Sequence, residues 1–121
     1  MNDQTTNRAV IPAEWRRAVC AILAARNAKS IRMTTTAWDR WEVDFPQTLK
    51  SDLYTVLETA LSRDVEGERV YGMFPDGEVY KFFFAYRKRS MYGKINLLLP
   101  QRQIILILSA HASDPAKGNT L

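Results

Sequence analysis

The sequence YGKINLLLPQRQIILILSAH, from Tyr92 to His111, decides the fold of this chain. Two apolar runs, at 92–99 and 104–109, stand on either side of the short polar segment 100–103. Aliphatic and β-branched residues in runs of this length are typical of strands, and a short polar break between two such runs is typical of an antiparallel hairpin. We therefore expect two paired strands, with the only histidine of the chain at the end of the second.

Two further strands are indicated upstream, where apolar residues alternate with a period of two. We expect them at 69–73 and 78–86, joined by the turn FPDG at 74–77. Proline presets the first turn angle and glycine tolerates a positive φ, so this tetrapeptide is a strong turn signal. A basic turn at 87–91 then leads into the hairpin. Consecutive strands of this kind predict an antiparallel meander.

Helical spacing dominates the first half of the chain. Apolar residues recur there every three or four positions, which predicts helices at 12–27, 36–44 and 47–62. Trp38 and Trp41 would form either a platform for stacked bases or part of the core, and helical spacing favours packing in the core. The predicted fold is α+β, with N-terminal helices packed on a four-stranded antiparallel β-sheet meander.

A single domain accounts for the 121 residues. We expect it to be helical over 12–62 and an antiparallel sheet over 69–111, with flexible ends at 1–10 and 112–121. No apolar run approaches the roughly 20 residues that cross a bilayer, and no signal-peptide pattern opens the chain. The sequence therefore predicts a cytoplasmic protein without a membrane partner.

The sequence does not indicate a metal or cofactor site. The lone Cys20 excludes an internal disulfide and cannot anchor a cysteine-rich zinc site. Neither metal-ligand spacing nor a glycine-rich phosphate loop occurs, so we expect no cofactor and no metal.

Charge is distributed unevenly along a chain whose net charge is +4. Residues 33–68 hold three basic and eight acidic side chains, whereas residues 69–111 hold seven basic and two acidic ones. A basic block of this kind favours a polyanion such as RNA as the partner. The alternative is that the two blocks simply complement each other within the fold.

Strand register predicts which side chains share a face with the histidine. We expect Arg87 to pair with Tyr92 and Leu99 to pair with Ile104. The apolar face of the sheet would then carry Phe82, Phe84, Ile95, Leu97, Leu106 and Leu108. The opposite, open face would carry Arg87, Tyr92, Lys94, Ser109 and His111.

This second set suits metal-independent cleavage of RNA by attack of the neighbouring 2′-hydroxyl. Such cleavage needs a base, an acid and cations for the charge of the phosphorane. Histidine titrates near neutral pH, so His111 is the candidate for either proton role. Tyr92 would donate a proton or orient the phosphate, and Arg87 and Lys94 would bear the developing charge.

Neighbouring residues complete a predicted RNA-binding surface. Lys88 and Arg89 at the turn would hold flanking phosphates, and Tyr86 or Phe83 would stack a base.

Simpler interpretations exist for the same residues. His111 would be an ordinary surface or structural histidine, and Tyr92 and Lys94 part of a solvated strand face. Ser109 is interpreted as a small strand residue, because no Gly-x-Ser-x-Gly elbow is present. The alternative function is a non-catalytic nucleic-acid- or protein-binding module from a mobile element, with the acidic segment 39–68 as its partner face. A third possibility, an immunity-type inhibitor, is disfavoured by the basic excess on the sheet.

The stretch GEVYKFFFAYRKRSMYGKINLLLPQRQIILILSAH, at 77–111, resembles the RelE-like group of small ribonuclease toxins, including its MqsR-like branch. It is also similar to the wider barnase, EndoU and colicin-type nuclease grouping, and the resemblance covers roughly residues 47–111. The resemblance implies an RNA endonuclease acting without metal, on or near the ribosome, and neutralised by a cognate antitoxin or immunity protein. Carried over to this sequence, it implies five site residues: Lys81, Arg87, Tyr92, Lys94 and His111. Many relatives end the last strand with a basic residue such as arginine, whereas this chain ends it with Ser-Ala-His.

Overall fold

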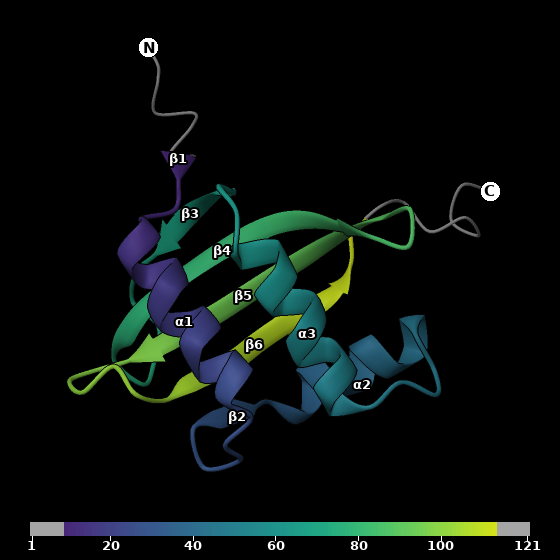
Figure 1. The fold of residues 1–121 in the computed structure, drawn as a ribbon, viewed down its shortest axis with the longest axis horizontal. Coiled ribbons are helices and arrows are strands. Elements are labelled where there is room, and N and C mark those ends of the chain that lie inside the picture. Colours follow the sequence, from purple (N-terminus) through teal and green to yellow (C-terminus); the bar gives the residue numbers. More distant parts are fainter. Residues whose placement is uncertain (1–8, 114–121) are drawn as a thin grey trace.

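A six-stranded mixed sheet runs through the protein, with the helices gathered on one of its faces (Figure 1). The computed structural model describes residues 9–113 of the chain. The strands are β1 (Ala9–Val10), β2 (Ile31–Met33), β3 (Glu66–Val70), β4 (Gly77–Tyr86), β5 (Arg89–Leu98) and β6 (Ile105–Ala112). Their order across the sheet is β1-β3-β4-β5-β6-β2, and only the pairing of β2 with β6 is parallel.

The three predicted helices are confirmed, within three residues at either end. They are α1 (Ala13–Ala25), α2 (Thr35–Asp44) and α3 (Lys50–Leu61). Local signals fix their ends. Arg26 ends α1 in the left-handed region at φ 55°, a common way to terminate a helix. The Thr34 hydroxyl accepts the N–H of Ala37 at 3.0 Å and so caps α2.

The predicted four-stranded antiparallel meander is present as β3-β4-β5-β6, but the prediction was wrong about the whole sheet. β1 adds an antiparallel edge beside β3, and β2 adds a parallel edge beside β6. The helices are therefore interleaved with strands rather than placed ahead of them all. Strands of two and three residues are too short to show a period of two, so the pattern could not reveal them.

Several strand boundaries differ from expectation, and β5 begins three residues before the predicted strand at 92–99. β3 begins and ends three residues earlier than the predicted strand at 69–73. Ala9 and Val10 belong to β1, and Ala112 belongs to β6, so the predicted flexible ends were too long. The remaining parts of these predictions, at 1–8 and 114–121, lie outside the described residues.

The core lies between the helices and one face of the sheet. Its largest wholly buried side chains include Trp15, Leu23, Trp41, Leu53, Leu57, Phe82, Ile95 and Ile105. Trp41 stacks on Tyr86 with ring centroids 5.7 Å apart, so the packing interpretation of this tryptophan is correct. Trp38 is half-buried beside the ammonium group of Lys50. None of the described helices is long and apolar enough to cross a membrane.

The β4–β5 hairpin closes on a two-residue turn, Arg87-Lys88, with Tyr86 opposite Arg89. The expected pairing of Arg87 with Tyr92 was therefore wrong. Both turn residues have positive φ, 52° and 65°, which is the backbone of a tight hairpin turn normally made by Asn-Gly or Asp-Gly. The register is displaced by an even number of residues, and side chains within β4 and β5 therefore keep the faces that the sequence predicted, whereas Arg87 lies in the turn.

The register of β5 with β6 is correct at the histidine end and wrong beyond it. Tyr92 lies opposite His111, and Lys94 opposite Ser109, as expected. A β-bulge then follows, because Ile95 lies opposite Ile107 and leaves Leu108 as an extra residue in β6.

The bulge exchanges the faces of β6. Ile105 and Ile107 are wholly buried, whereas Leu106 and Leu108, which were expected in the core, are only half-buried. One extra residue thus lets β6 bury two isoleucines while His111, further along, still points to the opposite face.

Candidate functional site

The described helices leave one face of the sheet uncovered (Figure 1). An aromatic row crosses this open face. Phe83 on β4, Tyr92 on β5 and His111 on β6 lie directly opposite one another in register. The ring centroids are 5.4 Å apart for Phe83 and Tyr92, and 5.3 Å apart for Tyr92 and His111. Phe83 is 43% exposed, and the other two rings are half-buried. The row offers a partly exposed aromatic surface of the kind on which nucleobases stack.

The imidazole of His111 is oriented by the backbone. Its Nδ1 lies 2.9 Å from the carbonyl oxygen of Ala112. A carbonyl oxygen only accepts hydrogen bonds, so this contact requires a proton on Nδ1. In the neutral ring, Nε2 is then the nitrogen with a lone pair, and His111 is arranged as a base through Nε2 and as an acid after it gains a proton.

A row of polar and charged residues lies next to the aromatic one. Lys81 on β4, Lys94 on β5 and Ser109 on β6 lie opposite one another, two residues along each strand from the aromatic row. The ammonium group of Lys81 is 3.4 Å from a carboxylate oxygen of Glu68 on β3. Lys94 makes no ion pair with any residue that the structure describes. Adjacent rows of a strand face lie about 7 Å apart, close to the spacing of successive phosphates.

Arg87 does not join this face, contrary to expectation. Its guanidinium lies 5.0 Å from the ring centroid of Tyr86 and 5.7 Å from that of Phe45, which are on the helix side of the sheet. The tight turn directs the side chain there, and the aromatic rings attract the cation.

Two other predicted RNA-binding residues also face the helices. Tyr86 packs on Trp41 and Phe45 on the helix side of the sheet, away from the face that carries His111. Arg89 is directed towards Asp44 of α2, with 3.9 Å between the nearest nitrogen and oxygen atoms. Both residues thus help to seat α2 against the sheet.

Two exposed cations extend the possible contacts of the open face. Lys88 is exposed at the turn and makes no ion pair with a described residue. Arg32 on β2 was missed by sequence reasoning. It lies opposite Leu106 in the parallel ladder, exposed on the same face as Lys94. The alternation of Ile31, Arg32 and Met33 is its only signal, and three residues are too few to predict a strand.

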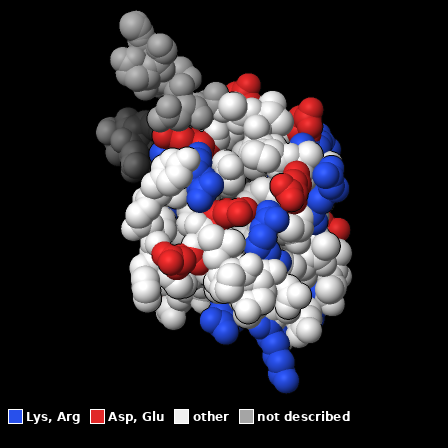
Figure 2. Space-filling model, turned by 90° about the vertical axis from the view of Figure 1, so that its left-hand side faces the viewer, with Lys and Arg blue, Asp and Glu red and all other residues white. Residues whose placement is uncertain are grey.

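Some acidic side chains of residues 33–68 form ion pairs with basic side chains of residues 69–111. Glu68 pairs with Lys81, and Asp44 with Arg89, so residues of the acidic and basic blocks meet directly. Figure 2 shows acidic and basic side chains interspersed on the side of the molecule that lies at the left of Figure 1. Internal complementarity thus accounts for part of the charge pattern, and the cations of the open sheet face lie on another side.

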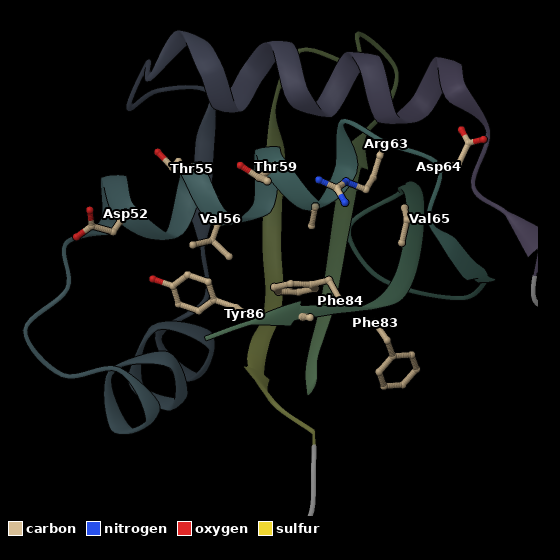
Figure 3. A pocket seen from close by; sticks show the side chains of 12 residues that line it. Asp52, Thr55, Val56, Thr59, Arg63, Asp64, Val65, Phe83, Phe84 and Tyr86 are labelled. Carbon is tan, nitrogen blue, oxygen red and sulfur yellow. The ribbon is translucent and has the colours of Figure 1, made fainter. Parts of the chain in front are cut away.

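A groove of about 530 Å³ lies away from the histidine, between α3 and the end of β4 (Figure 3). Val56, Thr59 and Arg63 line it from the helix side, and Phe84 and Tyr86 line it from the strand. Sequence reasoning did not predict this groove, because it depends on where β3 stops relative to β4.

Comparison of the chain with family models, with curated proteins and with solved structures gives no match in any of the three. The resemblance to RelE-like toxins therefore stays a prediction. Among the described residues, no three His, Cys, Asp or Glu side chains form a group that could hold a metal ion.

Proposed function

We propose that this protein is a toxin-like RNA endonuclease that cleaves RNA by attack of the 2′-hydroxyl on the adjacent phosphate. The observation that carries the proposal is the pairing of Tyr92 with His111 on the open sheet face, beside Lys94, which has no ion pair with a described residue. These groups supply a base, an acid and a cation within the space of one nucleotide.

The proposed mechanism uses residues of this chain only. His111 removes the proton of the 2′-hydroxyl through Nε2, since Nδ1 is engaged by the backbone. The 2′-oxygen attacks phosphorus, and the bond to the 5′-oxygen breaks. The Tyr92 hydroxyl gives its proton to that leaving oxygen, and Lys94 offsets the charge on the phosphorane. The products are a 2′,3′-cyclic phosphate and a free 5′-hydroxyl.

Substrate binding would come from the remaining residues of the face. A base stacks on the exposed part of Phe83, the member of the aromatic row on β4. Phosphates next to the cleaved one contact Lys81, Arg32 and Lys88. A cytoplasmic setting, with a cognate antitoxin or immunity protein that keeps the enzyme inactive, completes the proposal.

The direct test is to incubate the purified protein with total RNA in the presence of EDTA. We expect fragments that end in a 2′,3′-cyclic phosphate. His111→Ala should abolish their formation while the circular dichroism spectrum and unfolding midpoint stay those of the parent. An unchanged cleavage rate in His111→Ala would rule out the mechanism.

A matched control separates catalysis from charge. Arg17→Gln removes one exposed cation from α1, far from the sheet face in sequence and on the helix side, and should leave cleavage unchanged.

A second candidate function is RNA binding without cleavage. It is favoured by the open setting of the aromatic row, since the large groove lies elsewhere and does not enclose His111. Salt-dependent binding of RNA with no cyclic-phosphate product, in wild-type protein and in His111→Ala alike, would identify this function instead.

A further inference from the structure

The last residue of β6, Ala112, carries two backbone groups that point away from β5. The carbonyl oxygen of Ser90 accepts the N–H of Ser113 at 2.8 Å, so these two residues form a hydrogen-bonded pair between the strands. Hydrogen-bonded and non-hydrogen-bonded pairs alternate along an antiparallel ladder, and the neighbouring pair of Ala112 with Met91 is therefore of the second kind. The N–H and C=O of Ala112 consequently point towards the outer side of β6.

Side chains, rather than a strand, satisfy these two outward groups. β2 pairs with β6 only from Ile105 to Ile107, so it does not reach Ala112. Oδ2 of Asp44, on α2, accepts the N–H of Ala112 at 2.9 Å. The carbonyl oxygen of Ala112 lies 2.9 Å from Nδ1 of His111. One backbone residue thus connects a carboxylate on a helix to the imidazole of the proposed site.

The carboxylate of Asp44 is oriented by a second contact. Its other oxygen, Oδ1, lies 3.9 Å from a guanidinium nitrogen of Arg89, the first residue of β5. Both side chains are half-buried, so solvent only partly screens the attraction between them. This contact leaves Oδ2 directed at the N–H of Ala112.

Asp44 stands at a position where a helix disfavours an acidic residue. It is the last residue of α2, and no basic residue lies in the last turn of that helix. The partial negative charge at a helix C-terminus repels a carboxylate. Asp44 therefore does not stabilise its own helix, and its hydrogen bond to Ala112 indicates a role at the end of β6.

We propose that Asp44 is a positioning residue, which holds His111 through the backbone of Ala112 in the tautomer that a base acting through Nε2 requires. The hydrogen bond to the Ala112 N–H fixes the end of β6. The carbonyl oxygen of the same residue then stays where it accepts the Nδ1 proton, and Nε2 keeps its lone pair. Without the carboxylate, the outward N–H loses its partner, the strand end moves, and Nδ1 has no fixed acceptor.

The tautomer of His111 can be measured directly, because it is the only histidine of the chain and gives one set of imidazole signals. Long-range proton–nitrogen correlation spectra of the full chain, recorded at mildly alkaline pH where an imidazole is neutral, identify the nitrogen that carries the proton. We expect the Nδ1–H form in the wild type and in Asp44→Asn, whose amide oxygen still accepts the Ala112 N–H. In Asp44→Ala we expect a mixture that contains the Nε2–H form.

Single-turnover cleavage of RNA measures the catalytic consequence, which rests on the proposed function. Asp44→Ala should lower the rate constant at saturating protein by at least about tenfold. The protein concentration that gives half of this rate should change by less than about twofold, because the side chains that contact RNA are unaltered. Asp44→Asn should restore most of the rate constant.

A matched control and a second variant complete the test. Asp39→Ala removes an exposed carboxylate from the same helix and should equal the wild type in tautomer and in cleavage. If Asp44→Ala fails to fold, Asp44→Ser takes its place, since the serine hydroxyl is too short to reach Ala112 but keeps a polar group at the helix end.

Three results would overturn the proposal. They are an Nε2–H form in the wild type, an unchanged tautomer in Asp44→Ala or its serine replacement, and a loss of the Nδ1–H form in Asp39→Ala as large as in Asp44→Ala. The proposed function fails separately. If the tautomer changes as expected but the wild type cleaves RNA no faster than Asp44→Ala, the positioning is confirmed and the role of His111 as the base is excluded.

Discussion

Tyr92 and His111 face each other across β5 and β6, with their ring centroids 5.3 Å apart. Their proximity is set by a backbone ladder rather than by a bond between the two side chains. Either side chain can therefore be altered without moving the other, which makes their roles separable by substitution.

Replacing Tyr92 by phenylalanine should separate proton donation from stacking. The ring and its contacts with Phe83 and His111 stay, but the hydroxyl is lost. We expect RNA affinity to change little and the single-turnover cleavage rate to fall by about 100-fold or more. The control is Tyr54→Phe on α3, which should have no effect. A cleavage rate within twofold of wild type would show that the phenol donates no proton. A twofold change in rate corresponds to about 0.4 kcal/mol of activation free energy, which is within experimental scatter.

The bulge predicts unequal losses of stability for substitutions at adjacent residues of β6. Ile107 is wholly buried, so Ile107→Ala should lower the free energy of unfolding by about 2–5 kcal/mol. Leu106 is half-buried on the open face, so Leu106→Ala should cost about 1 kcal/mol or less. Urea unfolding measures both. A larger loss in Leu106→Ala than in Ile107→Ala would mean that β6 follows the regular register without a bulge.

Gly93, between Tyr92 and Lys94, lies against a buried ring. A Cβ added there would stand 2.7 Å from two ring carbons of Phe82, which is wholly buried and cannot retreat. We expect Gly93→Ala to lower the free energy of unfolding by about 1–3 kcal/mol. Adding Phe82→Leu makes room, so the double variant should lose less than the sum of the two single losses. If the loss in the double variant equalled the sum of the two single losses, the predicted clash between a side chain at position 93 and the Phe82 ring would be contradicted.

The basic turn supplies two cations, but its backbone conformation lowers the stability of the fold. Arg87 and Lys88 both hold positive φ, which costs non-glycine residues about 1–2 kcal/mol each. Replacing the pair with Asn-Gly should raise the free energy of unfolding by about 1 kcal/mol after the ring contacts of Arg87 are lost. The same change should weaken RNA binding and flatten its salt dependence. A Gln-Gln pair, which lacks the charges but keeps the strain, is the control and should weaken binding without stabilising. If both variants bound RNA as tightly as the wild type, Lys88 would not be part of the RNA-binding surface.

Alkaline pH should destabilise the protein through two half-buried acidic groups on the helices, the Cys20 thiol and the Tyr54 phenol. Burial raises the pKa of the Cys20 thiol above its ordinary value of 9.0, and the Glu58 carboxylate adds to this. Burial also raises the pKa of Tyr54, against the opposing charge of Arg26. The folded state therefore keeps protons that the unfolded chain releases, and the stability present below the unfolded pKa is lost as pH rises through the folded one.

The measurement is the urea midpoint across about pH 7.5 to 10.5. Cys20→Ser, which removes the thiol, should give a shallower decline at the alkaline end. Parallel curves for the two proteins would contradict a contribution from Cys20.

Long periodic segments of the sequence were informative about the fold. Three helices and four strands carry enough apolar residues for their period to be counted, and all seven exist. β1 and β2 carry too few. β2 pairs with β6 because residues 31–33 lie between two helices that dock on the sheet, which is a tertiary constraint that local pattern does not contain.

The sequence predicted only the part of the candidate site that depends on side-chain alternation along the strands. Side-chain alternation placed Tyr92, Lys94 and His111 on one face, and turn length alone decided where Arg87 points. A two-residue turn with two positive φ values is not expected of Arg-Lys, so the wrong register of this hairpin follows from an unusual local backbone. The bulge had no sequence signal, since Leu108 is as apolar as its neighbours.

The parallel ladder between β2 and β6 joins residue 31 to residue 105. During synthesis, β2 has no partner strand until residues 105–107 have emerged from the ribosome. Contacts between such distant positions form late and slowly. The face that carries His111 is therefore completed only after β6 has been synthesised, although β2 is made about 70 residues earlier.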